Sequence, residues 1–458
     1  MNHQEKTKLF ENTPIPKAVM TLAVPTVLSS LVMILYNLAD TYFVGMLNNP
    51  YENAAVTLAG PVLLAFNAIN NLFGVGSSSM MSRALGIKDY ETVRRSSAFG
   101  FYCALICALL FSLGTTIFKN PLLALLGAEG ETIAPTAEYM KWTVTFGAAP
   151  AILNVVMAYL FRAEGAALHA SIGTMSGCLL NIILDPIFIL PWGLNLGAAG
   201  AGCATFVSNS VACLYFFVLM IVRKKNTYVC IALSAFKPKK ELVTGICGVG
   251  IPASIQNLLN VTGMTILNNF MAAFGSEAVA AMGIAHKTTM IPMYVAMGIS
   301  QGVMPLVGYN YAARNAGRMK HATVYAAKLS LAIMVSATIC YLIFADSLVR
   351  LFMDHELIVS YGAAFMRGLC LAQPFLCLDF LGVGVFQACG MGKKSLLFAF
   401  LRKIVLEIPA LFLLNHFFPM YGLAYAQLCA EVALATAAVI FMTKIFKQAA
   451  QPSPLQDH

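Results

Sequence analysis

The sequence predicts an all-α polytopic membrane protein with twelve transmembrane helices in two pseudo-symmetric six-helix bundles. Three observations support this class. Of the 458 residues, 59% are hydrophobic and only 11% are charged, with a mean hydropathy of +0.76. Apolar runs of about 20 residues recur along the whole chain, and the second half of the chain repeats the first. A soluble chain of this length could not bury so much apolar surface, and the short alternating segments of a transmembrane β-barrel do not appear.

The apolar runs are long enough to cross a bilayer as helices, which takes about 20 residues each. We expect the twelve spans at residues 17–45, 54–80, 97–118, 140–161, 170–191, 198–222, 243–270, 277–306, 323–345, 362–388, 396–416 and 421–445.

The linkers between these spans alternate in charge. Those after the second, sixth and eighth spans are basic, whereas those after the odd-numbered spans are poor in lysine and arginine and often acidic. The basic residues include Arg83, Lys88, Arg94, Arg95, Arg223, Lys224, Lys225, Lys237, Lys239, Lys240, Arg314, Arg318 and Lys320. Because cytoplasmic loops carry an excess of Lys and Arg, we expect a cell (inner) membrane protein with both termini in the cytoplasm. The net charge of +9 then reflects topology rather than nucleic-acid binding.

The two halves of the chain resemble each other at a shift of about 222–227 residues. The matching segments are Leu22–Pro25 with Gly248–Pro252, Lys88-Asp89 with Arg314-Asn315, Phe161–Gly165 with Phe386–Gly390, and Leu184-Asp185 with Leu406-Glu407. Since each half has an even number of spans, both halves begin on the same side and form a parallel repeat. We therefore expect one bundle over residues 1–230, with a cation site, and a second over residues 231–458.

Two carboxylates, Asp40 and Asp185, fall inside apolar spans. A charged side chain at mid-bilayer costs about 2.5–3.5 kcal/mol even on lenient scales, so such residues are usually functional. Other polar side chains share their depth. The expected cation-binding set is Tyr36, Asp40, Asn154, Asn181, Asp185 and Thr205. These oxygens suit a Na⁺ ion held chiefly by Asp40 and Asp185, and the same pair of acids could instead exchange protons; the sequence leaves both open.

The second half differs at the equivalent positions. Leu267 takes the place of Asp40, and Glu407, the counterpart of Asp185, has Lys403 one helical turn before it. The ion site is therefore expected in the first half alone. Candidate residues of a substrate path in the second half are Asp379, His286, Lys287, Met290 and Met293, the methionines because flexible thioether side chains adapt to varied ligands.

The sequence contains no signature of ATP binding, of a zinc protease or of a serine hydrolase. The twelve cysteines show no metal-site spacing. We therefore expect no enzyme activity and no cofactor beyond the coupling ion.

Taken together, several motifs resemble the MATE (multidrug and toxic compound extrusion) family along nearly the whole chain, closest to its bacterial drug-efflux branch. They are Pro25, Asp40–Gly45, Asn71–Gly76, Ser82–Asp89 and Asn181–Phe188. The resemblance implies two six-helix bundles, export of organic, often cationic, compounds driven by inward Na⁺ or H⁺ movement, and a first-bundle cation site at the six residues named above. Some relatives carry a membrane-buried Glu in the seventh span. The matching residue here is Asn260, which we add to the candidate substrate cavity.

The sequence is best interpreted as a cation-coupled antiporter that acts on small organic, cationic or amphipathic substrates, as a monomer in the lipid bilayer. Two alternatives remain. A flippase of lipid-linked precursors from the same superfamily needs a cavity lined by basic residues, and only Lys287, Arg367, Arg402 and Lys403 lie in or near the spans. A membrane-embedded enzyme would need a catalytic constellation beyond the acids. The sequence does not identify the natural substrate, the coupling ion or its stoichiometry.

Overall fold

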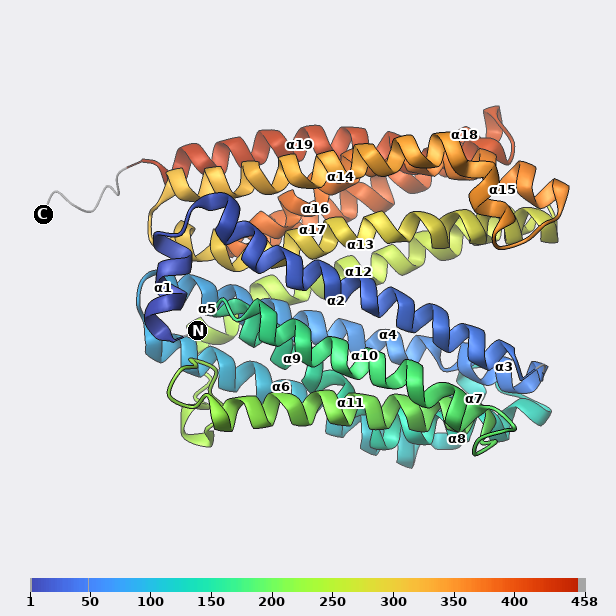
Figure 1. Cartoon of the computed structure of the whole chain (residues 1–458), viewed down its shortest axis with the longest axis horizontal. Coiled ribbons are helices and arrows are strands. Elements are labelled where there is room, and N and C mark those ends of the chain that lie inside the picture. Colours follow the sequence, from blue (N-terminus) through green and yellow to red (C-terminus); the bar gives the residue numbers. More distant parts are fainter. Residues whose placement is uncertain (1, 48, 452–458) are drawn as a thin grey trace, which may run out of the picture. The chain divides into compact units, whose positions relative to one another are not determined.

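The computed structural model describes residues 2–47 and 49–451, which are helical almost throughout (Figure 1). The α-helices are α1 (His3–Glu11), α2 (Ile15–Gly45), α3 (Pro50–Leu58), α4 (Gly60–Ile69), α5 (Gly76–Gly86), α6 (Tyr90–Ile117), α7 (Lys119–Leu125), α8 (Ile133–Met140), α9 (Ala148–Ala163), α10 (Ala167–Ile189), α11 (Gly197–Val222), α12 (Lys240–Ala272), α13 (Ser276–Ala312), α14 (Ala316–Arg350), α15 (Glu356–Cys370), α16 (Gln373–Ala388), α17 (Gly392–Phe400), α18 (Ile408–Phe417) and α19 (Ala426–Ala449). The wider π-helical turns are η1 (Asn70–Val75), η3 (Lys141–Phe146) and η5 (Leu401–Glu407), and the 3₁₀ turns are η2 (Gly130–Thr132), η4 (Leu233–Ala235) and η6 (Tyr421–Tyr425). No β-strand occurs in residues 2–47 or 49–451.

Within the described residues, nine helical segments are long and apolar enough to cross a membrane. Two further spans are bent. Gly130–Phe146 meets Ala148–Ala163 at 49°, and Glu356–Cys370 meets Gln373–Ala388 at 45°. The eleventh expected span, 396–416, falls on α17, η5 and α18, whose middle carries Arg402, Lys403 and Glu407. Those charges make it less apolar than the other spans.

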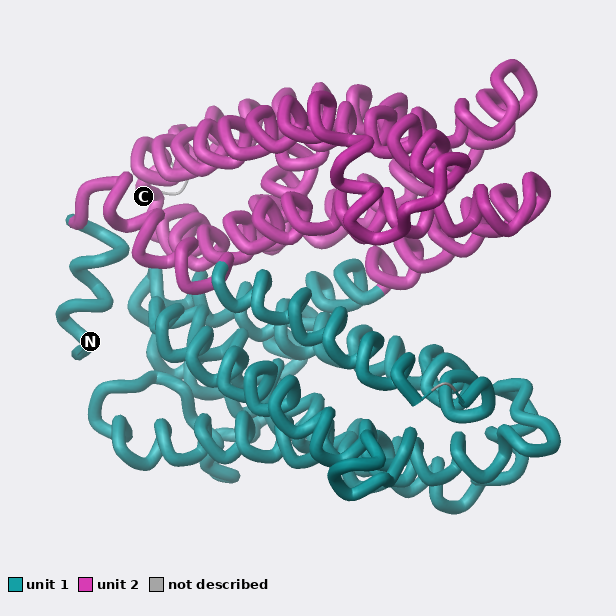
Figure 2. The backbone as a smooth tube through the Cα atoms, turned by 45° about the vertical axis from the view of Figure 1, so that its right-hand side comes forward, with its two compact units in different colours: residues 1–12, 28–254 teal, residues 13–27, 255–458 magenta. Residues whose placement is uncertain are grey.

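The chain forms two compact units (Figure 2). Unit 1 comprises residues 1–12 and 28–254, and unit 2 comprises residues 13–27 and 255–458. The first helix of each repeat, α2 or α12, therefore contributes to both units. The sequence division into domains 1–230 and 231–458 follows the repeat rather than these contacts, and it stays a prediction.

Close helix packing fixes the shared helices in each unit. In unit 2, a Cβ added to Gly302 of α13 would lie 2.7 Å from the Cα of Ala23 at the start of α2. In unit 1, a Cβ added to Gly250 of α12 would lie 2.0 Å from the carbonyl oxygen of Leu72. Small residues allow such close backbone approach between membrane helices, so both glycines hold a shared helix against its unit.

The backbone repeats local details at the spacing that the sequence predicts. In the described chain, the non-glycine residues with positive φ are Lys88 (60°), Asn195 (53°), Arg314 (59°) and Met420 (67°). Lys88 pairs with Arg314 and Asn195 with Met420 across the two halves. Lys88 and Arg314 each precede a helix N-cap. Asp89 accepts a hydrogen bond from the Thr92 N–H, and Asn315 accepts one from the Arg318 N–H, both at 3.0 Å. The same turn therefore begins α6 and α14.

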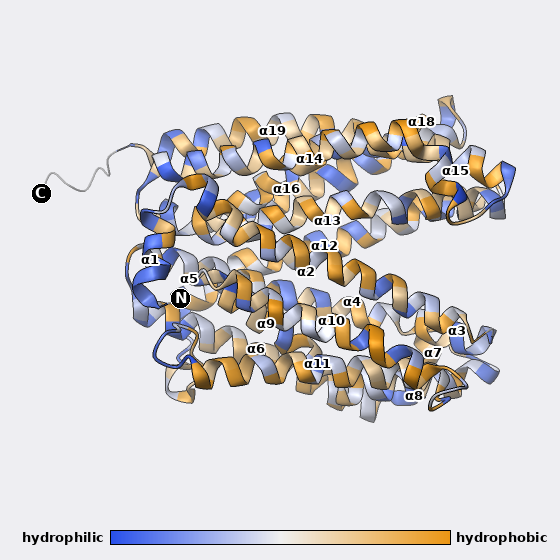
Figure 3. Cartoon of the chain, viewed as in Figure 1, coloured by the Kyte–Doolittle hydropathy of each residue, from blue (hydrophilic) through white to orange (hydrophobic). Residues whose placement is uncertain are grey.

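Hydrophobic residues occur along all the long helices (Figure 3), and many of their side chains are exposed. On α6, for example, Leu109, Leu110, Leu113 and Ile117 are all more than half exposed. Inside unit 2, buried residues including Met282, Phe365 and Leu423 form a hydrophobic core. Exposed apolar faces of this extent are expected where lipid, rather than water, surrounds the helices.

Candidate functional site

Asp185 lies on α10 and is completely buried in unit 1. The side-chain amide of Asn181, one helical turn earlier, lies between this carboxylate and α11. Its nitrogen, turned toward Asp185, donates to Oδ2 at 2.8 Å, and its oxygen then accepts from the Thr205 backbone N–H at 3.1 Å. This orientation satisfies both ends of the amide, because a carboxylate only accepts and an N–H only donates. Asn181 therefore links Asp185 to Thr205.

Asp40 lies on α2 and belongs to the same polar cluster as Asp185. Its carboxylate interacts electrostatically with that of Asp185, although the two lie on different helices. The Tyr36 phenol, one turn earlier, lies beside both Asp40 and the hydroxyl of Thr205. The structure thus brings together five of the six expected residues: Tyr36, Asp40, Asn181, Asp185 and Thr205.

Tyr139 belongs to this cluster, and the sequence analysis missed it. It lies on α8, is 4% exposed, and interacts electrostatically with both Asp40 and Asp185. The expected span began at residue 140, so Tyr139 fell outside it.

Asn154, the sixth expected residue, is held by other partners. Its side-chain nitrogen donates to the backbone oxygens of Pro150 and Ala151, at 2.8 and 3.1 Å, and to Asn209 Oδ1 at 3.0 Å. Asn209 lies on α11 one turn beyond Thr205, so this asparagine pair cross-links α9 to the helix that carries Thr205. Asn209 was not predicted, because a single amide in an apolar span has no distinguishing pattern.

Unit 2 arranges its charged groups differently. Lys403 Nζ donates to both carboxylate oxygens of Glu407, each at 2.7 Å, which confirms the pairing expected from their spacing. His286 lies near this pair, and its Nε2 atom is buried with no hydrogen-bond partner among the residues that the structure describes. The counterpart of Asp185 is therefore neutralised within its own helix.

Asp379 takes part in a second buried ionic group. Arg402 Nη1 lies 3.3 Å from Asp379 Oδ2, and Arg402 Nε donates to Glu431 Oε1 at 2.7 Å. All three side chains are at least 96% buried. The Arg402 guanidinium also lies over the Phe380 ring, 5.0 Å from its centroid. The positive charge of Arg402 is thus paired with two carboxylates, Asp379 of α16 and Glu431 of α19.

The remaining candidates of the substrate path are less enclosed. Lys287 is exposed on α13, and Asn260, Met290 and Met293 are partly buried on α12 and α13. The structure assigns them no common site, so their role stays a prediction.

The chain is similar in sequence and in structure to known proteins. A MatE family model matches it twice, over residues 25–187 and 252–413. The multidrug export protein MepA of Staphylococcus aureus (strain N315) is 35% identical over 442 residues, covering 96% of each chain. MepA of Staphylococcus saprophyticus is 33% identical over 443 residues, again covering 96% of each.

Solved structures match over the same length. An outward-facing multidrug resistance MATE family transporter of the MOP superfamily superposes with a TM-score of 0.90 at 28% identity, over 96% of this chain and 98% of that one. A MOP superfamily transporter from Pyrococcus furiosus, described as having a binding pocket of reverse polarity that suggests a different function, gives a TM-score of 0.90 at 27% identity, over 98% and 99%.

The bilayer-spanning helices and the polar groups buried among them define a multi-pass α-helical membrane protein of the transporter class. The chain belongs to the MATE (multidrug and toxic compound extrusion) family. The two family matches begin at residues 25 and 252, which confirms the internal repeat. The twelve-span, two-repeat architecture is confirmed by the structural matches, and family membership sets aside the membrane-enzyme alternative.

Proposed function

We propose that this protein is a multidrug efflux antiporter that exports organic compounds by alternating access, driven by inward movement of Na⁺ or H⁺. The MepA relatives are named multidrug export proteins, which supports the substrate class. The coupling proposal rests on the pair Asp40 and Asp185, which separate helices contribute to one polar cluster in which Asp185 is completely buried and Asp40 partly buried.

The cluster offers two ways to bind a cation. Carboxylate, amide and hydroxyl oxygens are the ligands that hard cations prefer, so Asp40, Asp185 and Thr205 suit a Na⁺ ion. Alternatively, one proton shared by the two acids relieves the repulsion between like charges in a low dielectric. In either case the bound cation lowers the cost of burying two negative charges, and it favours whichever arrangement of helices encloses the pair most fully.

Drug binding must favour the opposite arrangement for exchange to occur. A ligand shifts a conformational equilibrium only by its difference in affinity between the two states. Export coupled to ion entry therefore requires that cation and drug prefer different states.

We propose cationic or amphipathic substrates, a monomeric protein, and a location in the cell membrane with both termini in the cytoplasm.

The flippase alternative needs free basic side chains to bind a diphosphate. Three of the four basic candidates are instead paired with carboxylates: Arg402 with Asp379 and Glu431, Lys403 with Glu407, and Arg367 with Asp346. Only Lys287, of those four, has no ion pair in the described structure. This charge balance favours efflux of organic cations over binding of a diphosphate.

Transport in proteoliposomes tests the proposal. Uptake of a fluorescent organic cation such as ethidium into inside-out-oriented vesicles is measured with an imposed Na⁺ gradient, an imposed H⁺ gradient, or neither. We expect one gradient to accelerate transport and Asp185→Asn to abolish that acceleration. Asp354→Asn, at an exposed position, is the matched control and should behave as the wild type. Transport that ignores both gradients would refute the antiporter, and gradient-driven transport by Asp185→Asn would refute the site.

A further inference from the structure

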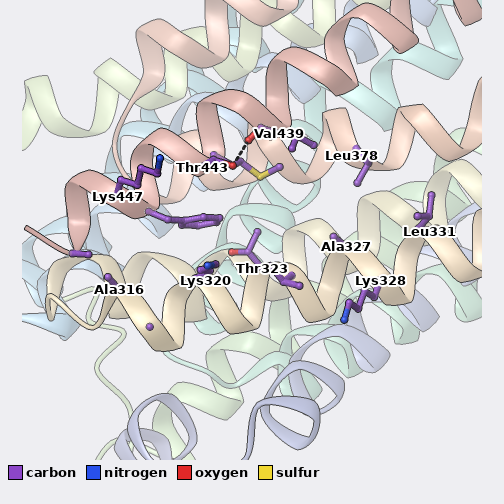
Figure 4. Close-up of a pocket in the computed structure, with 15 residues that line it drawn as sticks. Ala316, Lys320, Thr323, Ala327, Lys328, Leu331, Leu378, Val439, Thr443 and Lys447 are labelled. Atoms are coloured by element: carbon purple, nitrogen blue, oxygen red, sulfur yellow. Dashed lines mark hydrogen bonds between the residues drawn. The ribbon is translucent and has the colours of Figure 1, made fainter.

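A groove of about 600 Å³ runs along unit 2 between α14 and α19, and Leu378 of α16 also lines it (Figure 4). The two helices are antiparallel neighbours here, so the start of α14 at Ala316 faces the end of α19 at Ala450. All lining residues belong to unit 2. Ligand pockets typically enclose roughly 300–1,000 Å³, so the groove can accommodate a small molecule or part of a lipid.

One end of the groove is positively charged. Lys320 of α14 and Lys447 of α19 line it from opposite sides, whereas Lys328, two turns further along α14, lies near Leu331 at the other end. All three lysines are exposed, and none forms an ion pair with a carboxylate of the described residues. The site therefore has unneutralised positive charge that an anion can use.

The other end is apolar. Leu331, Leu378 and Val439 line it, and Leu331 and Val439 are exposed to the surroundings. The hydroxyls of Thr323 and Thr443 line the middle, but each donates to a backbone oxygen of its own helix, at 3.0 and 2.8 Å. A ligand that fits the groove must therefore combine an anionic head with an apolar tail.

The length of the groove matches one leaflet of a bilayer. From Ala316 to Leu331 the helix rises about 22 Å, at 1.5 Å per residue. Half a bilayer, from its midplane to the outer edge of the headgroups, is also about 20–22 Å. Lys320 and Lys447, near the helix ends, then lie at the depth of the phosphates, and Leu331, Leu378 and Val439 lie at the depth of the acyl chains.

We propose that this groove binds an anionic phospholipid, with the phosphate between Lys320 and Lys447 and an acyl chain along Leu331, Leu378 and Val439. Basic pockets between transmembrane helices are a recognised way to bind anionic headgroups. Only the choice of leaflet, the cytoplasmic one, depends on the orientation proposed above. The bound lipid would bridge α14 and α19. If the groove does not bind lipid, the drug-export proposal is unaffected.

The test uses the full-length protein in detergent, titrated with phosphatidylglycerol and, in parallel, with phosphatidylcholine of the same acyl chains; binding is followed by native mass spectrometry. We expect preference for phosphatidylglycerol, and a weakening of roughly 30-fold in the double variant Lys320→Gln/Lys447→Gln, since each lysine near an anionic headgroup contributes about fivefold. The matched control, Lys393→Gln/Lys444→Gln, removes two exposed lysines outside the groove and should change binding less than twofold. Equal weakening by both double variants, or equal binding of the two lipids, would overturn the proposal.

Two further arms separate a lipid from a simple anion and allow for misfolding. Ala327→Phe fills the groove while keeping all its charges, so it should also weaken phosphatidylglycerol binding; unchanged binding would refute the acyl-chain position. Inorganic phosphate at millimolar concentration should not displace the lipid, and displacement would identify a free-anion site instead. Drug transport by each variant, measured separately, verifies that the protein is folded and shows whether the efflux proposal stands on its own.

Discussion

At the scale of single residues, the buried Glu164 carboxylate accepts hydrogen bonds from several separate segments of unit 1. It ends α9, and its carboxylate accepts from Lys6 Nζ at 2.7 Å, Thr227 Oγ1 at 2.9 Å and the Tyr228 N–H at 2.6 Å. These partners belong to α1 and to the linker after α11. Burial raises the pKa of the Tyr228 phenol, which lies near this carboxylate, to about 12. Glu164 therefore ties three segments together at one end of unit 1.

We predict that Glu164→Ala destabilises the protein by about 3–5 kcal/mol, because it leaves the buried Lys6 ammonium without its carboxylate. The double variant Lys6→Met/Glu164→Leu should recover much of that loss, since no unpaired charge remains. Thermal unfolding in detergent measures both. The control is Glu138→Ala, which breaks the half-exposed Glu138–Lys141 pair (3.2 Å) and should cost less than about 1 kcal/mol. Equal effects of the two single variants would contradict this account.

The same scale shows what the sequence could predict about the candidate site. Asp40 and Asp185 stand out because a carboxylate in an apolar span is costly wherever it points. Asn181 and Tyr36 follow from helical spacing to those acids. Tyr139 and Asn209 could not be found in this way, because their contacts come from packing between α8, α9 and α11, and local sequence carries no record of which helices become neighbours.

At the scale of elements, α6 and α14 begin at equivalent positions of the two repeats, but one helix has an aspartate N-cap and the other an asparagine N-cap. Asp89 and Asn315 both follow a residue of positive φ and accept from a backbone N–H three residues on. Only Asp89 can be titrated. Hydrogen bonds from the Thr92 hydroxyl and N–H hold the pKa of Asp89 below its ordinary value, as expected for a carboxylate at a helix N-terminus.

We therefore predict that Asp89→Ala and Asn315→Ala each cost about 1 kcal/mol at neutral pH, but respond differently to acid. A lowered folded-state pKa gives stability that is present above the unfolded pKa and lost as pH falls through the folded value. The cost of Asp89→Ala should thus shrink when the pH drops below the ordinary aspartate value of about 4, whereas the cost of Asn315→Ala should not change. Thermal unfolding at neutral and acidic pH measures this. Parallel pH responses of the two variants would show that the Asp89 charge does not matter.

The packing of α2 against α13 gives a second prediction at this scale. A Cβ on Gly302 would meet the backbone of Ala23, but a Cβ on Gly283 of the same helix would have no described atom within 4 Å beyond its own stretch of helix. Gly302→Val should therefore force the start of α2 away from α13, at a cost of roughly 1–3 kcal/mol. Gly283→Val should lack that cost, although it changes helix propensity equally. The melting temperatures in detergent compare them, and equal temperatures would mean that this contact is not tight.

The helices themselves were largely predictable, since long apolar runs with charged ends determine where a span begins and stops. The bends were not. In the fourth span the break falls at Gly147, where a Cβ would lie 2.5 Å from the Thr143 carbonyl oxygen. In the eleventh span, Arg402, Lys403 and Glu407 lie in the π-helical turn η5, and the sequence shows their charges but not their buried partners.

At the scale of the whole molecule, the connections within unit 1 agree with the alternating topology expected from charge. Lys6 of α1 donates to the Asn226 backbone oxygen in the linker after α11, and to Glu164 between α9 and α10. Lys88, in the turn after α5, lies 4.0 Å from Glu11 of α1. The N-terminal helix thus meets the linkers after the second, fourth and sixth spans, which must all lie on one side if each span crosses the membrane once.

Because these linkers carry Lys88, Arg223, Lys224 and Lys225, the positive-inside rule assigns them to the cytoplasm. We predict that a membrane-impermeant maleimide added to intact cells labels Asp354→Cys, in the acidic linker after the ninth span, but not Lys225→Cys. Both cysteines should react once the membrane is permeabilised, which controls for accessibility, and the wild type gives the background from the twelve native cysteines. Labelling of Lys225→Cys in intact cells would reverse the orientation. It would also move the proposed lipid groove to the outer leaflet, because the start of α14 is joined to the eighth span and must lie on the same side as the other basic linkers.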